Sequence, residues 1–478
     1  MFGWMQGLGG RRLLALLVLT AAEFVVFLDI AIVNVALPEI GRDLDLGEEL
    51  AWVVNAYQVT FGGVLLLGGR LADLVGRRRM FLIGLALFTA ASLGAGLAAS
   101  GAILIAARLA QGLGAALVVP AALALLVTVF SEAEDYRRAF GVWSAMRSGG
   151  ASLGGALGGI LTQALGWPWI FLINVPVGVA VLVLGLAVLP ERRTPAAARL
   201  DIIGAATVTA GALLIVYGIV RLAERGTGSG GAVAALVAAA LLLAVFVRHE
   251  ARAEAPLVPL GIFRSGDLQG ATLASLLFGA AHVPMFLFIS LYLQLVLGYS
   301  ALATGLALLP IGIVVIGASL LIMPRVLARF GVKRLLIGGL LLLALGIGLL
   351  ATGPTNSSYV LNVLGPGVII ALGLAGCFGG VTIPAVEAVE PDDAGLASGL
   401  VNSVQRIGSG IGVAVLTAVA IAVAGTLDGA PADVAPGIRA AFAGASVFAL
   451  LGAACAFVLL RPAAEAMAPE TTSSVRTR

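Results

Sequence analysis

The sequence predicts an all-α membrane protein with fourteen transmembrane helices arranged as six, two and six. Hydrophobic residues make up 60% of its 478 residues and charged residues only 11%, with a mean hydropathy of +1.09. The apolar residues gather in stretches long enough to cross a bilayer as helices. One short basic segment also recurs early and late in the chain. A water-soluble protein of this length would need many more surface charges.

Fourteen mostly apolar stretches qualify as spans of about 17–25 residues. In chain order they cover 14–37, 50–69, 80–99, 102–126, 139–162, 168–189, 203–221, 231–247, 268–294, 301–323, 334–352, 359–385, 396–424 and 440–460. We expect residues 1–190 to form a first six-helix bundle, 191–265 to form two inserted linker helices and 266–478 to form a second six-helix bundle. Arg11 and Arg12 resemble the start of a signal peptide, but the apolar run reaches Pro38 without a cleavage site, which favours a first anchor.

The distribution of basic residues predicts the orientation of the chain. With the N-terminus in the cytoplasm, most of the 28 Lys and Arg residues fall in cytoplasmic segments, as the positive-inside rule requires. We therefore expect both termini in the cytoplasm. Lys333 is the only lysine, which is typical of a GC-rich bacterial genome and favours a bacterial cytoplasmic (inner) membrane.

Composition also excludes several classes of protein. A net charge of +3 is too small to indicate nucleic-acid binding, and two cysteines and two histidines predict neither a disulfide framework nor a metal site. The sequence has no nucleotide-binding GxxxxGK[ST] loop and no HExxH or GxSxG motif, so neither bound ATP nor an intramembrane enzyme is favoured.

The recurring basic segment indicates an internal duplication. Arg70–Arg79 and Arg325–Arg334 share Arg, Gly and Arg at matching positions, with Gly76 opposite Gly331. Arg147 and Arg406, each followed by a glycine-rich stretch, form a weaker echo. Repeated halves are how many transporters build alternating access around a central site.

Further motifs carry a resemblance to a known family over nearly the whole chain. They are Leu28–Pro38 in the first span, Gly69–Arg79 in the following loop, Arg108–Gly114, Gly150–Gly159, Trp169–Pro176 and Gly395–Gly399. Together they resemble the major facilitator superfamily, specifically its fourteen-helix drug:proton antiporter branch. Gly154-Gly155 replaces the family's usual Gly-Pro, and Arg147 and Glu23 stand where small or neutral residues are common.

The resemblance implies a major facilitator fold and proton-driven export of small hydrophobic or amphiphilic compounds, including drugs and antibiotics. It implies small molecules, protons and the bilayer as partners, no cofactor beyond the proton gradient, and a monomer. The alternatives are a dedicated exporter of one endogenous metabolite or lipid precursor, and a non-transporting membrane sensor.

Ionisable residues inside a bilayer are costly, so each predicted one needs a role. Five lie within spans: Glu23, Asp29, Arg108, Arg147 and Arg406. The resemblance places Arg108 near Asp29, either as a proton-coupling pair or as a permanent structural ion pair. Glu23 lies six residues before Asp29, which turns the two acids about 120° apart on a helix. It either takes part in proton coupling or stays neutral and hydrogen-bonded between helices.

Arg147 is expected either to pair with Glu23 or to meet an anionic substrate, with the internal pair favoured; Arg406 has a matching or a structural role. A cavity of amide and aromatic groups is predicted from Asn34, Tyr57, Gln58, Phe278, Phe286, Tyr292 and Gln294, with lipid-facing or helix-packing positions as the alternative. His282 is expected to be a core histidine, with a proton relay as the alternative.

Two glycine-bearing segments are expected to support movement. Gly69, Asp73, Gly76, Arg77 and Arg78 would form a conformational latch between the halves, or serve topology alone. Gly154, Gly155, Gly158 and Gly159 would let their helix bend and approach its neighbours closely.

Overall fold

The computed structural model describes residues 8–191, 201–225, 230–254, 256–353, 358–390, 393–425 and 429–460. Within these residues the fold is all-helical. The predicted positions of both chain ends, and the boundary of the first bundle near residue 191, fall on or beside residues outside this description.

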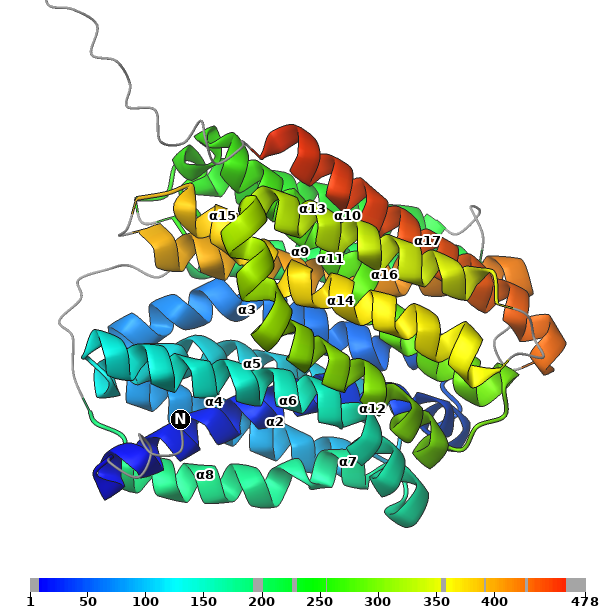
Figure 1. The fold of residues 1–478 in the computed structure, drawn as a ribbon, viewed down its shortest axis with the longest axis horizontal. Coiled ribbons are helices and arrows are strands. Elements are labelled where there is room, and N and C mark those ends of the chain that lie inside the picture. Colours follow the sequence, from blue (N-terminus) through cyan, green and yellow to red (C-terminus); the bar gives the residue numbers. More distant parts are fainter. Residues whose placement is uncertain are drawn as a thin grey trace, which may run out of the picture.

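Long helices follow one another along the described chain, and most extend past the predicted spans (Figure 1). They are α2 (Gly10–Asp43), α3 (Leu50–Val75), α4 (Arg77–Gly96), α5 (Gly101–Val129), α6 (Ala133–Leu165), α7 (Trp169–Leu172), α8 (Asn174–Val188), α9 (Ile202–Arg225), α10 (Gly230–Glu250), α11 (Gly266–Leu291), α12 (Ala301–Gly317), α13 (Met323–Ala351), α14 (Gly365–Gly380), α15 (Thr382–Glu387), α16 (Ala394–Ala424) and α17 (Pro431–Leu459). Short helical turns at Tyr292–Val296, Ala318–Ile322 and Val360–Leu364 extend α11, join α12 to α13 and precede α14.

Serine caps mark the start of several helices. The side chains of Ser100, Ser265 and Ser300 accept hydrogen bonds from backbone N–H groups three residues on, at the starts of α5, α11 and α12. Such caps satisfy N–H groups that have no partner within the helix. At α5, α11 and α12, the serine and the apolar residues that follow it therefore determine where the helix begins.

Twelve helices within the described residues are long and apolar enough to cross a membrane. One of them, Ala301–Ala351, is 51 residues long, and Gly331 interrupts it with a φ of 74°. Helix α6, 33 residues long, is not among the twelve, although its Leu153–Leu165 part is an apolar helix. The chain is thus a multi-pass membrane protein.

The helices form two groups that meet along a common interface. Figure 1 shows α2–α8, blue to teal, in the lower part of the view and most of the green-to-red helices in the upper part, with α12 reaching down beside α6. We call α2–α8 the first group and α11–α17 the second group. Close contacts join the groups where α6 meets α12 and where α3 meets α16, and α9 packs against both α3 and α16. We call the end where α2 begins the inner end and the end where α2 finishes, at Asp43, the outer end.

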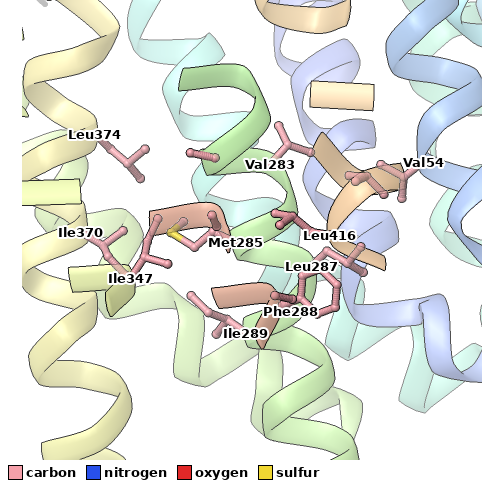
Figure 2. Close-up of a cluster of buried hydrophobic side chains, with 14 of the residues drawn as sticks. Val54, Val283, Met285, Leu287, Phe288, Ile289, Ile347, Ile370, Leu374 and Leu416 are labelled. Atoms are coloured by element: carbon pink, nitrogen blue, oxygen red, sulfur yellow. The ribbon is translucent and has the colours of Figure 1, made fainter. Parts of the chain in front are cut away.

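A hydrophobic core extends across the interface. Figure 2 shows Met285, Phe288 and Ile289 of α11 among apolar side chains of the second group, with Val54 of α3 nearby. Burial of such side chains stabilises helices against each other by packing rather than by exclusion of water in lipid. This packing holds the helices that carry the buried polar side chains in fixed relative positions.

The repeated basic segment has a glycine with positive φ at the matching position of each copy. Gly76 ends α3 with φ 114° and ψ 129°, and Gly331 interrupts the long helix with φ 74° and ψ 168°. Residues with a side chain rarely adopt positive φ. The pairing of Gly76 with Gly331, made from sequence alone, thus corresponds to a shared turn.

Candidate functional site

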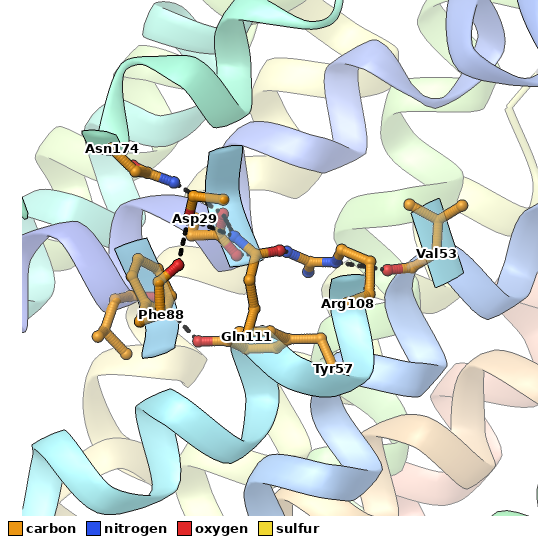
Figure 3. A network of polar contacts seen from close by, with 9 residues as sticks. Asp29, Val53, Tyr57, Phe88, Arg108, Gln111 and Asn174 are labelled. Atoms are coloured by element: carbon orange, nitrogen blue, oxygen red, sulfur yellow. Dashed lines mark hydrogen bonds and ion pairs between the residues drawn. The ribbon is translucent and has the colours of Figure 1, made fainter. Parts of the chain in front are cut away.

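Asp29 lies in the middle of α2 within a complete set of hydrogen-bond donors (Figure 3). Arg108 Nη1 donates to Asp29 Oδ2 in a buried ion pair. Gln111 Nε2 donates to Oδ1 at 3.1 Å, and Asn174 Nδ2 donates to the same oxygen at 3.0 Å. The Asp29 residue is 0% exposed. Three donors from α5 and α8 therefore surround the two oxygens of this carboxylate.

Arg108 is anchored on its other sides as well. Its Nε donates to the carbonyl O of Val53 at 2.8 Å, and Nη1 also donates to Gln111 Oε1 at 2.9 Å. The guanidinium carbon lies 4.4 Å from the centre of the Tyr57 ring, a cation–π distance. The Tyr57 hydroxyl donates to the carbonyl O of Val26 at 3.3 Å. This network ties α2, α3, α5 and α8 together inside the first group.

A second polar cluster lies one and a half turns earlier on α2, where the two groups meet. Glu23 is 0% exposed, and both of its carboxylate oxygens lack a hydrogen-bond partner within the described residues. The guanidinium carbons of Arg147 and Arg406 lie 4.3 and 4.9 Å from the centre of the Phe27 ring. Both arginines interact electrostatically with Glu23. Glu23 and Asp29 thus have separate surroundings on one helix.

The favoured Arg147–Glu23 pairing takes no hydrogen-bonded form in the described residues, although the two charges interact electrostatically. Arg147 Nη2 donates instead to Asn402 Oδ1 at 3.4 Å, across the interface to α16. Arg406 Nη1 donates to Gln58 Oε1 at 3.4 Å, across the interface in the opposite direction. Each arginine therefore donates to an amide of the other group and also packs against the Phe27 ring.

The alternative in which Glu23 is hydrogen-bonded between helices is not what the structure shows, since its oxygens have no hydrogen-bond partner in the described chain. His282 lies in the core as expected. Its Nδ1 is 3.0 Å from the carbonyl O of Phe278, and its ring stacks on the Phe278 ring with centroids 4.4 Å apart.

The other predicted cavity residues do not form one site. Asn34 and Gln294 lie at the outer end, where Ser290 donates to the carbonyl O of Asn34 at 2.9 Å and Gln294 donates to that of Val35 at 3.0 Å. Tyr292 packs near Phe442 within the second group, with centroids 6.4 Å apart. Phe286 is partly buried on α11. Gln58, Arg147 and Arg406 are the predicted substrate residues that the structure brings together.

The glycines of α6 face two different helices. A Cβ on Gly154 would lie 3.0 Å from the backbone N of Ile32, and one on Gly158 would lie 2.6 Å from its carbonyl O, both on α2. A Cβ on Gly155 would lie 3.3 Å from Leu308, and one on Gly159 would lie 2.9 Å from the Cα of Leu302, both on α12. These four glycines allow close approach along α6, which runs as one helix; bending at them stays a prediction.

The predicted latch contacts helices of its own group. Arg77 Nη1 donates to Thr128 Oγ1 of α5 at 2.9 Å, and Arg77 Nη2 lies 3.5 Å from Asp73 Oδ1. Arg78 Nη1 lies 3.3 Å from Glu191 Oε2. A Cβ on Gly69 would make only an ordinary contact, 3.8 Å from Pro120. A latch between the groups would belong to another conformation and stays a prediction.

Sequence reasoning missed the residues that complete both clusters. Gln111 and Asn174 stand within recognised motifs, but nothing in their spacing shows that both reach Asp29. Phe27 and Asn402 carry no motif at all, and their contacts with the arginines depend on how the groups pack. No group of three or more His, Cys, Asp or Glu side chains suited to a metal occurs in the described ranges.

Membrane-length helices in two groups, with charged side chains buried where the groups meet, define a polytopic membrane transport protein. The Major Facilitator Superfamily matches this sequence over residues 19–413. The chain belongs to that superfamily, whose members are transporters and not enzymes and need no cofactor.

Relatives with similar sequences are export and resistance proteins. The cephamycin export protein CmcT of Amycolatopsis lactamdurans is 39% identical over 466 residues, covering 96% of this chain and 94% of the relative. The puromycin resistance protein pur8 of Streptomyces alboniger is 40% identical over 485 residues, covering 98% and 95%. A crystal structure of the peptide transporter POT, 16% identical, matches with a TM-score of 0.68 over 92% of this chain and 93% of that one, which shows the same fold.

Proposed function

We propose that this protein is a proton-coupled exporter of small hydrophobic or amphiphilic compounds that works by alternating access. The observation that carries the proposal is the pair of buried acids on α2, Asp29 inside the first group and Glu23 where the two groups meet, each beside at least one arginine. A buried acid can take up and release protons at a central site. The sequence similarity to CmcT and pur8 supports export of antibiotic-like compounds.

The proposed architecture has fourteen spans. Dividing Ala301–Ala351 at Gly331 and adding α6 to the twelve long apolar helices gives this number. Residues 1–190 and 266–478 would form the two six-helix bundles, and 191–265 the inserted pair. We place the protein as a monomer in the bacterial cytoplasmic membrane, with both termini in the cytoplasm, so that the inner end faces the cytoplasm.

In this orientation the structure corresponds to a form that is closed at the outer end. Gly155 and Gly159 of α6 lie against α12 there, and Leu302 N donates to Gln163 Oε1 at 3.3 Å. Ser290 and Gln294 of α11 donate to backbone carbonyls of α2 at the same end. Export requires these contacts to break while contacts at the inner end form.

Roles follow for the residues of both clusters. Asp29, Arg108 and Glu23 are candidates for proton coupling, whereas Gln58, Arg147 and Arg406 are candidates for contact with substrate at the interface. Export of one endogenous metabolite is the second candidate function, because the name of CmcT specifies a single class of compound, the cephamycins.

The test uses purified full-length protein in liposomes that carry a pH gradient. Puromycin and a cephamycin serve as separate probes, and empty liposomes and a protonophore control for leakage. We expect gradient-dependent movement of at least one probe, and loss of that dependence in Asp29→Asn, in Glu23→Gln or in both. Gly141→Ala is the matched control, because its added methyl group meets no atom within 4 Å.

Movement of both probes favours a broad exporter, and movement of the cephamycin alone favours a dedicated one. If neither probe moves under the gradient while the protein remains folded, proton-coupled export is the wrong function.

A further inference from the structure

Glu23 differs from Asp29 on the same helix because no hydrogen-bond donor of the described chain contacts its carboxylate. Both of its oxygens are buried and unpartnered within the described residues, and the residue is 0% exposed. Leaving a buried charge without donors is costly. The groups that face it are Arg147 from α6, Arg406 from α16 and Tyr57 from α3. Uptake of a proton neutralises this carboxylate without breaking a hydrogen bond.

Asp29 shows the opposite arrangement. Three side-chain donors point at its two oxygens, and one belongs to a guanidinium that is itself 1% exposed. Adding a proton to Asp29 would place an O–H among donors and leave Arg108 without its counter-charge. That step costs several interactions at once. The Asp29 network is therefore suited to hold four helices of the first group together, and poorly suited to exchange a proton in each cycle.

The two arginines beside Glu23 belong to different groups. Arg147 is on α6 of the first group and Arg406 is on α16 of the second, and both lie against the ring of Phe27. Ionised Glu23, on the first group, attracts Arg406 across the interface and offsets its repulsion from Arg147. Once Glu23 is neutral, the repulsion between the arginines remains and the attraction is gone.

We infer that Glu23 carries the exchanged proton, and that its protonation changes the electrostatic contact between the groups at Arg147 and Arg406 from attraction to repulsion. A proton from water joins the Glu23 carboxylate, and the arginines keep their charge throughout. Asp29 and Arg108 then act as positioning residues that keep α2 in register with α5. This inference rests on the proposed function and assigns its coupling step.

The experiment measures the conformational equilibrium directly against pH. Spin labels are attached to Leu165→Cys on α6 and Leu306→Cys on α12, both solvent- or lipid-accessible positions at the outer end. Cys377 and Cys455, the free cysteines of the described chain, are replaced by Ala. Pulsed EPR in liposomes at about pH 5.5 and about pH 8.5 gives the ratio of populations with short and long outer-end distances.

We expect the ratio in the otherwise unchanged protein to shift roughly 5- to 150-fold between the two pH values, the range of an ordinary coupling free energy. Glu23→Gln should show the low-pH ratio at both pH values, whereas Glu23→Asp should restore a pH response. Arg406→Gln should reduce the shift, because the repulsion is lost. His282→Gln is the matched control and should keep the full shift, although His282 is a titratable neighbour of Arg406.

A full pH shift in Glu23→Gln, or its loss in Asp29→Asn alone, would assign the proton elsewhere and overturn the inference. Absence of any shift in the labelled parent protein would also overturn it. Gradient-driven movement of puromycin is measured in parallel without labels. If the parent protein moves no puromycin or cephamycin, the proposed function fails; if Glu23→Gln retains gradient dependence, the inference alone fails.

Discussion

Gly159→Ala should open the outer end of the protein by overpacking one contact between the groups. A Cβ at Gly159 would lie 2.9 Å from the Cα of Leu302 on α12, where carbon atoms normally keep at least about 3.5 Å apart. Both sides of the contact are backbone, so no side chain can turn away. The helices must separate by roughly half an ångström or more, and overpacking of this kind costs about 1–3 kcal/mol.

That cost falls only on the form in which the outer end is closed. The equilibrium should therefore shift toward the opposite form by roughly 5- to 150-fold, since about 1.4 kcal/mol corresponds to a factor of ten. The spin-label pair on α6 and α12 measures the shift as a larger population with a long outer-end distance. Gradient-driven transport should slow, because the closed form becomes less accessible in each cycle.

Two substitutions on the same helix separate this effect from general damage. Gly158→Ala crowds the carbonyl O of Ile32 at 2.6 Å, but α2 and α6 belong to the same group. It should lower thermal stability without changing the outer-end distance. Gly141→Ala should raise stability by up to about 1 kcal/mol through helix propensity alone. An unchanged distance in Gly159→Ala, or an equal change in Gly158→Ala, would refute the reasoning.

Three further predictions concern stability. Asp29→Ala leaves the guanidinium of Arg108 buried without its counter-charge and should lower the free energy of unfolding by about 3–5 kcal/mol. Asp73→Asn, in the exposed latch, should lower it by less than about 1 kcal/mol. Denaturant unfolding in detergent compares the two variants. Gly331→Ala should lower the free energy of unfolding by about 1–2 kcal/mol, because an alanine at φ 74° has a strained backbone. An added Cβ would meet no atom within 4 Å, so crowding does not contribute. Thermal unfolding measures the loss, and a neutral effect would show that the turn relaxes. Burial works to raise the pKa of Asp201, but hydrogen bonds from the Gly204 N–H and from His249 outweigh it and lower the pKa. The Asp201 carboxylate therefore stabilises the fold when the pH is above the ordinary Asp pKa of about 3.9, and this contribution is lost as the pH falls through the lowered pKa. Asp201→Asn should lower the free energy of unfolding by about 1–3 kcal/mol at neutral pH and by little in acid. An equal loss at both pH values would contradict this prediction.

The helices could be predicted from the sequence, because apolar stretches long enough to cross a bilayer form helices in lipid. The seventh and eighth predicted spans, 203–221 and 231–247, lie within α9 and α10. Helix ends were predicted too short, since α2 continues to Asp43, beyond the apolar residues. Backbone hydrogen bonding continues a helix through polar residues, which hydropathy alone does not register.

The interior was harder to predict, because side-chain partners depend on the packing of distant helices. The angle between Glu23 and Asp29 follows from helical periodicity, and the two acids do have different neighbours. Periodicity does not show that Phe27, one turn after Glu23, would take up the guanidinium faces of Arg147 and Arg406. Both arginines therefore make cation–π contacts with Phe27, and Glu23 interacts with them electrostatically without accepting a hydrogen bond from the described residues.

The two seams between the groups differ in a way that constrains the movement. Along the α3–α16 seam, Ser403 Oγ donates to the carbonyl O of Gly62, and α9 covers both helices with a cluster that includes Val59, Val216 and Ala414. Separation of α3 from α16 would expose that cluster, and α9 would lose its packing against one of these two helices. The α6–α12 seam has no such cover among the described residues, and the close backbone contacts identified there, such as Gly159 against Leu302, lie at the outer end. Rocking should therefore pivot about the α3–α9–α16 side and open along α6 and α12, where Arg147 extends from α6 toward α16. A charge change at Glu23 then acts between Arg406 on the pivot side and Arg147 on the moving helix α6.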